Sequence, residues 1–358
     1  PPATVAIIKD SNVNYATMVS QALTAALGSG GIGNLVHSGD TVLIKPNLVA
    51  DLTDAVTDWR LVKALVDQIK TVNGGAAITI GEGSASQDVF AIMNAQGYTA
   101  ANFGSGVTFA NYNDNDTNPT DTYVLADSRT GATKQIPNLV ANADVYIDMP
   151  KMKTHYHAGY TGALKNLGIG TGPLPLWEIS GGYAKAGLHH DIRTEIVDHI
   201  ACRVPDLTVM DAIRAMEGQG PGSGTMVTMN LVLASKDPLA LDAVATTIMG
   251  IPPSLITHMV LAANENIGVI DMNNITVAGN TSIAAVQRDF LRATPGAVQG
   301  PTEPGVIPYR NTTVIRTAPS MTIDGDLAEW GYANPMTVDA TYQVKYAAGW
   351  GGAADSSL

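Results

Sequence analysis

The stretch ADVYIDMPKMKTHYHAGYTGALKNLG, residues 143–168, determines how the rest of the chain is interpreted. Its apolar and β-branched run at 145–149 is typical of a buried strand. Pro150 has no N–H to donate to a neighbouring strand, so we expect the strand to end there. A short helix is predicted at 161–167. The stretch therefore reads as a strand, a polar connection and a helix.

Positive and imidazole side chains are concentrated just after this predicted strand. The chain is poor in cations, with 20 Lys and Arg in 358 residues, so a local concentration of them is informative. Ligands of open α/β sheets bind outside the carboxyl ends of the strands. We therefore expect a functional site here, where a solvated surface is the simpler alternative. The residues concerned are Lys151, Lys153, His155, His157 and Lys165.

Strands and helices alternate on both sides of this stretch. Apolar runs predict strands at 4–9, 41–44, 77–80, 207–210, 229–234 and 275–277, and helical periodicity predicts helices at 15–27, 58–72, 86–96, 194–202, 239–249 and 255–265. This order favours an α/β fold with a mostly parallel sheet and helices on both faces. We assign residues 1–280 to this domain, with a polar insertion at 102–137.

Four of the predicted strands end in charged residues. If these strands share one sheet, their ends lie along one edge, because parallel strands run in the same direction. Lysines there can neutralise a phosphate or carboxylate, and a carboxylate can orient a histidine or take a proton. The four strand ends carry Lys45, Glu82, Lys151 with Lys153, and Asp211.

Several short motifs in this order resemble the domain of unknown function 362 family over roughly residues 5–279. The motifs are KPN at 45–47, PKMKTH at 150–155, TGALKN at 161–166, Asp211 with MEGQGP at 216–221, and DP at 237–238 with LDA at 241–243. The resemblance implies a single α/β domain of a kind found in exported or redox-associated bacterial and archaeal proteins. Some relatives carry an added ferredoxin-like cluster domain. This chain has one cysteine, Cys202, so no Cys-ligated iron–sulfur cluster is expected.

The resemblance also indicates which residues form the site. Our hypothesis is that three lysines bind a small anionic ligand, that His155 acts as general acid or base with Lys153, and that Glu217 or Asp211 orients it. Asp242 also matches the motifs, although bracing a helix is a structural alternative for it. The predicted ligand-binding residues are Lys45, Asn47, Thr161, Lys153, Lys165 and Asn166.

Two metal sites are further hypotheses. His155 and His157 lie on the same side of an extended backbone, and His189 with Glu217 or Asp211 could complete a three-ligand divalent metal site. The sequence NYNDNDTNPTD at 111–121 partly resembles a calcium loop through Asp114 and Asp116, although the usual glycine and glutamate are missing. A plain polar loop is the alternative there.

The overall charge excludes two classes of partner. The net charge is −12, whereas binding to nucleic acid needs a basic face and docking on anionic lipid needs basic residues. No apolar run is long enough to span a bilayer. The acidic, Lys-poor surface favours an extracellular or cell-envelope protein.

The C-terminal region differs from the rest of the chain. Residues 281–318 are predicted to be a linker or extension, and 319–358 an irregular, β-rich tail. The sequence MTIDGDLAEW at 321–330 resembles the opening of a family-nine-like carbohydrate-binding β-sandwich. A part of a sandwich leaves unpaired edges, so a second hypothesis is an extracellular structural subunit that self-associates into a filament through this tail.

Overall fold

The computed structural model describes residues 2–52, 54–85, 88–113, 123–127, 131–173, 185–189 and 191–294. Contacts divide the chain into two units, Pro1–Glu303 and Pro304–Leu358, and only the first contains described residues. The predicted tail at 319–358, most of the predicted linker, and the calcium candidates Asp114 and Asp116 therefore lie outside the described residues.

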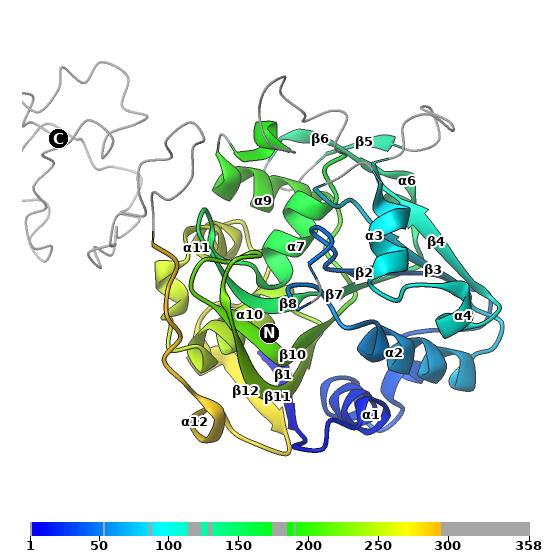
Figure 1. Cartoon of the computed structure of the whole chain (residues 1–358), viewed down its shortest axis with the longest axis horizontal. Helices are drawn as coiled ribbons and strands as arrows, with labels where there is room; N and C mark the ends of the chain where they lie inside the picture. Colours follow the sequence, from blue (N-terminus) through cyan, green and yellow to red (C-terminus); the bar gives the residue numbers. More distant parts are fainter. Residues whose placement is uncertain are drawn as a thin grey trace, which may run out of the picture. The chain divides into compact units, whose positions relative to one another are not determined.

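Helices and strands alternate through the first unit (Figure 1). The strands are β1 (Ala3–Lys9), β2 (Thr41–Pro46), β3 (Ala77–Glu82), β4 (Val107–Asn111), β5 (Tyr123–Asp127), β6 (Thr133–Pro137), β7 (Val145–Met149), β8 (Lys151–His155), β9 (Gly159–Tyr160), β10 (Leu207–Glu217), β11 (Thr225–Ser235) and β12 (Ile275–Gly279). The helices are α1 (Tyr15–Leu27), α2 (Trp59–Val72), α3 (Val89–Ala95), α4 (Ala100–Phe103), α6 (Asn138–Asn142), α7 (Gly162–Gly170), α9 (Ile192–Cys202), α10 (Pro238–Ile248), α11 (Thr257–Asn264) and α12 (Ile283–Val286), with short 3₁₀ helices η1 (Gly31–Asn34), η2 (Ala186–His189), η3 (Pro253–Leu255) and η4 (Met272–Asn274).

A ten-stranded mixed sheet organises the domain. Its main order is β12-β1-β11-β10-β7-β2-β3-β4, and β8 joins through β10 and carries β9. The strands from β10 to β4 run parallel, as does β1 with β12, whereas β11 is antiparallel to both of its neighbours. The predicted α/β fold with a mostly parallel sheet is confirmed. A separate hairpin of β5 and β6 lies in the predicted insertion.

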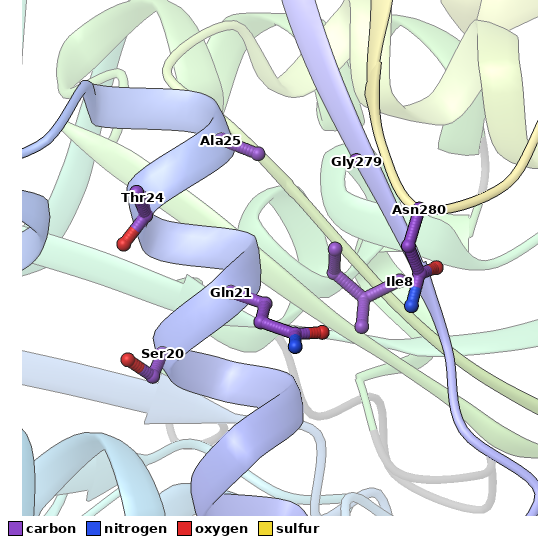
Figure 2. Close-up of a pocket in the computed structure, with 7 residues that line it drawn as sticks. All are labelled: Ile8, Ser20, Gln21, Thr24, Ala25, Gly279 and Asn280. Atoms are coloured by element: carbon purple, nitrogen blue, oxygen red, sulfur yellow. The ribbon is translucent and has the colours of Figure 1, made fainter.

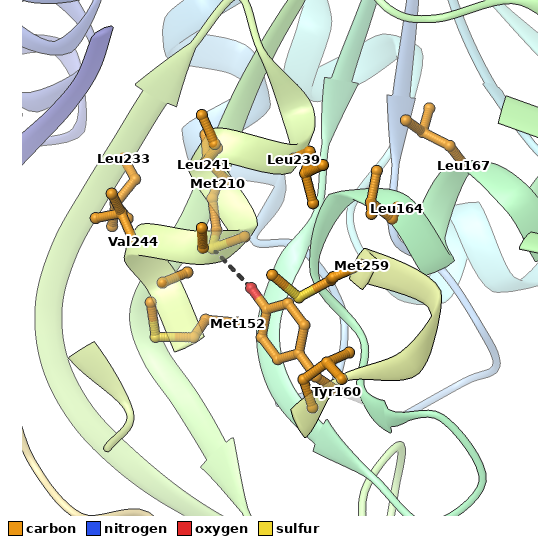
Figure 3. Close-up of a cluster of buried hydrophobic side chains, with 14 of the residues drawn as sticks. Met152, Tyr160, Leu164, Leu167, Met210, Leu233, Leu239, Leu241, Val244 and Met259 are labelled. Atoms are coloured by element: carbon orange, nitrogen blue, oxygen red, sulfur yellow. Dashed lines mark hydrogen bonds between the residues drawn. The ribbon is translucent and has the colours of Figure 1, made fainter. Parts of the chain in front are cut away.

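Both faces of the sheet are buried, because alternate residues of each strand point to opposite sides. In β1, Ile7 packs in one apolar cluster and Ile8 in the other. The helices α1 to α4 cover the Ile8 face, and α7, α9, α10 and α11 cover the Ile7 face. Figure 3 shows the cluster on the Ile7 face, to which Tyr160, Leu164 of α7 and Met259 of α11 belong.

Three strand boundaries differ from the sequence-based prediction. Strand β10 does not end at Asp211 but continues to Glu217, because an irregularity between Ala212 and Arg214 lets it stay paired with β11. The segment Lys151–His155, which was predicted to be a loop after the strand, is itself a strand that pairs with β10. Strand β4 lies inside the predicted insertion and pairs with β3.

The helix boundaries follow the expected capping chemistry. Asp58 precedes α2 and its carboxylate accepts a hydrogen bond from the Arg60 N–H. Asp237 precedes α10 in the same way, with Pro238 at the first helical position. Among the described residues, no helix combines the length and the hydropathy that crossing a bilayer requires.

Candidate functional site

The ends of β2 and β3 meet in a buried ion pair. Lys45 Nζ lies 2.7 Å from Glu82 Oε1, and neither side chain is exposed to solvent beyond a few per cent. The other Glu82 oxygen accepts the Leu48 N–H at 2.7 Å. Gly170, at the end of α7, packs directly on Lys45, and a Cβ at that position would collide with the ammonium group. The backbone of α7 thus closes over the pair.

Amide side chains extend this pair into a buried network. Asn166 Oδ1 accepts from Lys45 Nζ at 3.1 Å and from Asn47 Nδ2 at 2.8 Å. Lys153 Nζ donates to Asn47 Oδ1 at 2.7 Å and to the Ala55 carbonyl at 2.7 Å. The network therefore joins β2, β8 and α7, which the motifs KPN, PKMKTH and TGALKN had predicted to lie together.

Asp148 lies beside Lys45 at the end of β7. The two residues are register partners on neighbouring parallel strands, and Asn166 Nδ2 donates to Asp148 Oδ1 at 2.7 Å. Burial raises the pKa of Asp148 well above its usual value. Asp148 Oδ2 has no hydrogen-bond partner among the described residues. These features fit a neutral carboxyl group that adds little negative charge to the network.

Lys151 and Asp211 form a second ion pair away from Lys45. Lys151 Nζ lies 2.9 Å from Asp211 Oδ2, and both side chains are buried. Asp211 also accepts the backbone N–H groups of Asp58, at 2.9 Å, and Ile213, at 3.1 Å. The carboxylate of Asp211, which was predicted to be catalytic, is therefore held by a lysine and two backbone N–H groups. These contacts join β8, β10 and the start of α2.

Lys165 differs from the other lysines. It lies on α7, is 8% exposed, and its ammonium group has no hydrogen bond or ion pair with any described residue. Burial, with a contribution from the charge of Lys45, lowers the pKa of Lys165 to about 8. Thr161, one helical turn earlier, is 1% exposed and its Oγ1 is also without a partner in the described part of the chain. Two polar groups on one face of α7 are thus buried without protein partners.

Three of the histidines lie near Lys165. Its charge contributes to lowering the pKa of each of them, after burial as the largest cause, and the pKa of His189 falls to about 3. The His157 ring lies 6.2 Å from that of His155 and 5.4 Å from that of His189, centre to centre. The imidazoles predicted to share a site are therefore neighbours, and they stay neutral at physiological pH.

The backbone fixes the tautomer of His155. Its Nδ1 accepts the N–H groups of His157, at 3.0 Å, and Ala158, at 3.2 Å. The proton of the neutral ring therefore lies on Nε2. In this arrangement His155 is a hydrogen-bond donor, because its only basic nitrogen is already occupied.

The predicted metal set is not assembled as a site. Among the described residues, no three His, Cys, Asp or Glu side chains are grouped closely enough to hold a metal ion. His155 uses Nδ1 for backbone amides, and His189 Nδ1 lies 2.8 Å from the Lys185 carbonyl oxygen. Each of these two rings therefore has one nitrogen already engaged.

Glu217 lies at the far end of β10 and contacts the segment after α12. Glu217 Oε2 accepts the Leu291 N–H at 3.0 Å, and the Gly218 N–H donates to the Leu291 carbonyl at 2.7 Å. Gln219 exchanges hydrogen bonds with Thr294 in the same way. No interaction joins Glu217 to Lys45, Lys165 or His155 in the described part of the chain. Glu217 thus fixes the segment 287–294 against the β10 turn.

Three further residues belong to the neighbourhood. Asp242 accepts the Ala163 and Leu164 N–H groups at 2.8 and 2.9 Å, so it caps α7 and not its own helix. Burial raises the pKa of Asp242 to about 7. Lys185 donates to the carbonyls of Gly83 and Ile169, and His258 of α11 is fully buried. Sequence reasoning missed Lys185 and His258, because neither follows a strand or belongs to a charged cluster.

A separate surface hollow lies between α1 and the ends of β1 and β12 (Figure 2). Its volume is about 340 Å³, and its lining includes Ser20, Gln21 and Asn280. The side chain of Asn280 is engaged with the backbone of Lys9. None of the lining side chains is charged or an imidazole, so this hollow lacks the groups that distinguish the Lys165 site.

Comparison with known proteins supports the resemblance found in the sequence. A thylakoid-associated protein of Synechocystis sp. is 27% identical over 269 residues, which cover 74% of this chain and 79% of that protein. Its name describes that protein alone, and the export expected for this chain stays a prediction. The carbohydrate-binding resemblance of the tail also stays a prediction.

Two further comparisons concern the fold and the family. The lactate racemase apoprotein from Thermoanaerobacterium thermosaccharolyticum aligns with a TM-score of 0.45 and 13% identity, and the match covers 69% of this chain and 57% of that structure. The chain thus spans little more than half of that protein. A family model matches residues 42–247, more than half of the chain. The chain therefore belongs to the family described as Domain of unknown function (DUF362).

Proposed function

We propose that this protein binds a small anion, carrying a phosphate or carboxylate group, at the ammonium group of Lys165. The observation that carries the proposal is the state of this lysine, which is 8% exposed and has no partner among the described residues. A buried charge without a partner is costly, and an anionic ligand would offset the cost. Neutralising a bound anion is thus the simplest role for Lys165.

The charge balance around Lys165 supports this proposal. Lys45 and Lys151 each have a carboxylate partner, in Glu82 and Asp211. Lys153 donates to an amide oxygen and a carbonyl oxygen, and burial, followed by the charge of Lys165, lowers its pKa well below the usual value. Burial raises the pKa of Asp148, which disfavours a negative charge in the same region. Lys165 is therefore left without a carboxylate partner in a region where two other lysines have one, and a bound anion would supply it.

The histidines supply hydrogen-bond donors around that charge. His155 is neutral because its pKa is lowered by burial, and its proton lies on the Nε2 atom. A neutral N–H group can donate a hydrogen bond to an anion without adding charge. The His155 ring is a weak base in this tautomer, because its Nδ1 atom already accepts hydrogen bonds. The arrangement therefore favours binding over the general acid–base role that the sequence suggested for His155.

Isothermal titration calorimetry of the full chain tests the proposal. Inorganic phosphate, sulfate and acetate are titrated into the wild type and into the Lys165→Met and Lys63→Met variants. Lys63 is a matched control, because it is a lysine on α2 paired with Asp67 at the surface. We expect at least one anion to bind the wild type and Lys63→Met, and the binding to be lost in Lys165→Met.

The melting temperature separates binding from folding. Methionine fills a similar volume without a desolvated charge, so Lys165→Met is expected to melt at the same temperature as the wild type or higher. Binding of no anion by the wild type, or equal binding by Lys165→Met, would contradict the proposal. A large fall in melting temperature would instead assign Lys165 a structural role.

A further inference from the structure

Three polar side chains around α7 are buried without partners. Thr161, Lys165 and His258 are 1%, 8% and 0% exposed. Among the described residues, the two ring nitrogens of His258 have no hydrogen-bond partner, and the hydroxyl group of Thr161 has none either. Buried polar groups are nearly always hydrogen-bonded in folded proteins, so three in one place call for an explanation.

The start of α11 lies close to the residues that precede α7. The ring of Tyr160, just before α7, lies beside Met259, the residue after His258 (Figure 3). A Cβ on Gly159 of β9 would lie 3.2 Å from the side chain of Ile256, which precedes α11, so the residues just before Thr161 and just before His258 lie close together. The charge of Lys165 also reaches the ring, because after burial it is the second cause that lowers the pKa of His258 to about 3.

These side chains differ in what they offer a ligand. The Lys165 ammonium group only donates hydrogen bonds. A neutral imidazole carries one N–H donor and one acceptor nitrogen, and the Thr161 hydroxyl can do either. The site therefore combines a positive charge with a buried acceptor. An anion with acceptor oxygens alone would leave the acceptor nitrogen unpaired, at the full cost of its desolvation.

We propose that the Lys165 site binds an oxyanion that still carries a proton, such as hydrogen phosphate. His258 then accepts a hydrogen bond from the P–OH group of the bound phosphate. The inference rests on the proposed anion-binding function and deepens it. Inorganic phosphate near neutral pH keeps at least one P–OH group, whereas sulfate has none. Phosphate and sulfate are similar in size and shape, so the proton is the feature that separates them.

Competitive calorimetry at neutral pH and constant ionic strength tests this inference on the full chain. We expect the wild type to bind inorganic phosphate at least about tenfold more tightly than sulfate, which corresponds to one buried acceptor left unpaired. His258→Leu fills the space without an acceptor and is expected to reduce the ratio to about one. His258→Gln keeps one donor and one acceptor, and is expected to retain the preference.

The outcomes separate this inference from the function it rests on. Equal affinity of the wild type for phosphate and sulfate would overturn the role of His258 and leave anion binding at Lys165 intact. Binding of neither anion would overturn both. Full preference in His258→Leu would also contradict the inference. If His258→Leu does not fold, His258→Gln and Thr161→Val decide, since Thr161→Val is expected to weaken phosphate binding while the protein stays folded.

Discussion

The buried lysines fall into two regions that differ in how their charges are compensated. At the ends of β2 and β3, Lys45 is paired with Glu82 and bonded to Asn166. On the side of α7, Lys165 is also buried, at 8% exposure, but has no partner in the described residues, and His258 has none either. A satisfied network fixes the relative positions of the strands. Buried polar groups without protein partners are more readily explained by a ligand than by stability.

The largest expected effect concerns the satisfied region. Lys45→Met leaves the Glu82 carboxylate buried without its cation, and Asn166 Oδ1 loses one donor. Breaking one side of a buried ion pair costs about 3–5 kcal/mol. We expect a loss of this size in the free energy of unfolding, measured by urea denaturation followed by circular dichroism.

The control for Lys45→Met is the exposed pair of Lys63 and Asp67 on α2. Lys63→Met is expected to change the free energy of unfolding by less than about 1 kcal/mol, because solvent screens this pair. A similarly small change in Lys45→Met would remove the difference between the paired and the unpaired lysines, and with it the reason to single out Lys165.

The sequence could predict the satisfied region because its residues follow apolar strand patterns. Lys45 and Glu82 end two predicted strands, and parallel strands bring such ends to one edge. The sequence could not predict that Asp211 lies within a strand, because the irregularity after Ala212 depends on pairing with β11. It also gave no indication of His258, a lone histidine in α11, because its relation to Lys165 depends on how the start of α11 lies beside Gly159.

The second prediction concerns the titration of Lys165. Its pKa is about 8 in the folded protein, against an ordinary value of 10.5. Between these two pH values the unfolded state binds more protons than the folded state, so this group makes the protein more stable as the pH rises. Below pH 8 both states are protonated, and the full cost of burying the charge is present.

Comparison with Lys165→Met isolates this contribution. The difference in free energy of unfolding, wild type minus variant, is expected to rise by up to about 3 kcal/mol between pH 8 and 10.5. Urea denaturation at intervals across this range measures it, with Lys63→Met as the control that should show no such trend. A flat difference would mean that the Lys165 charge is already compensated in the folded protein, which would weaken the contrast with Lys45.

The smallest expected effect concerns Glu217, which the sequence placed in the site and the structure places against residues 287–294. Glu217→Ala removes the acceptor of the partly exposed Leu291 N–H. We expect a loss of about 1 kcal/mol in the free energy of unfolding, because one hydrogen bond is lost where water can replace it. Calorimetry should give the same phosphate affinity as the wild type, since no described interaction links Glu217 to Lys165. A loss of phosphate binding with unchanged stability would return Glu217 to the site and extend the unsatisfied region to the end of β10.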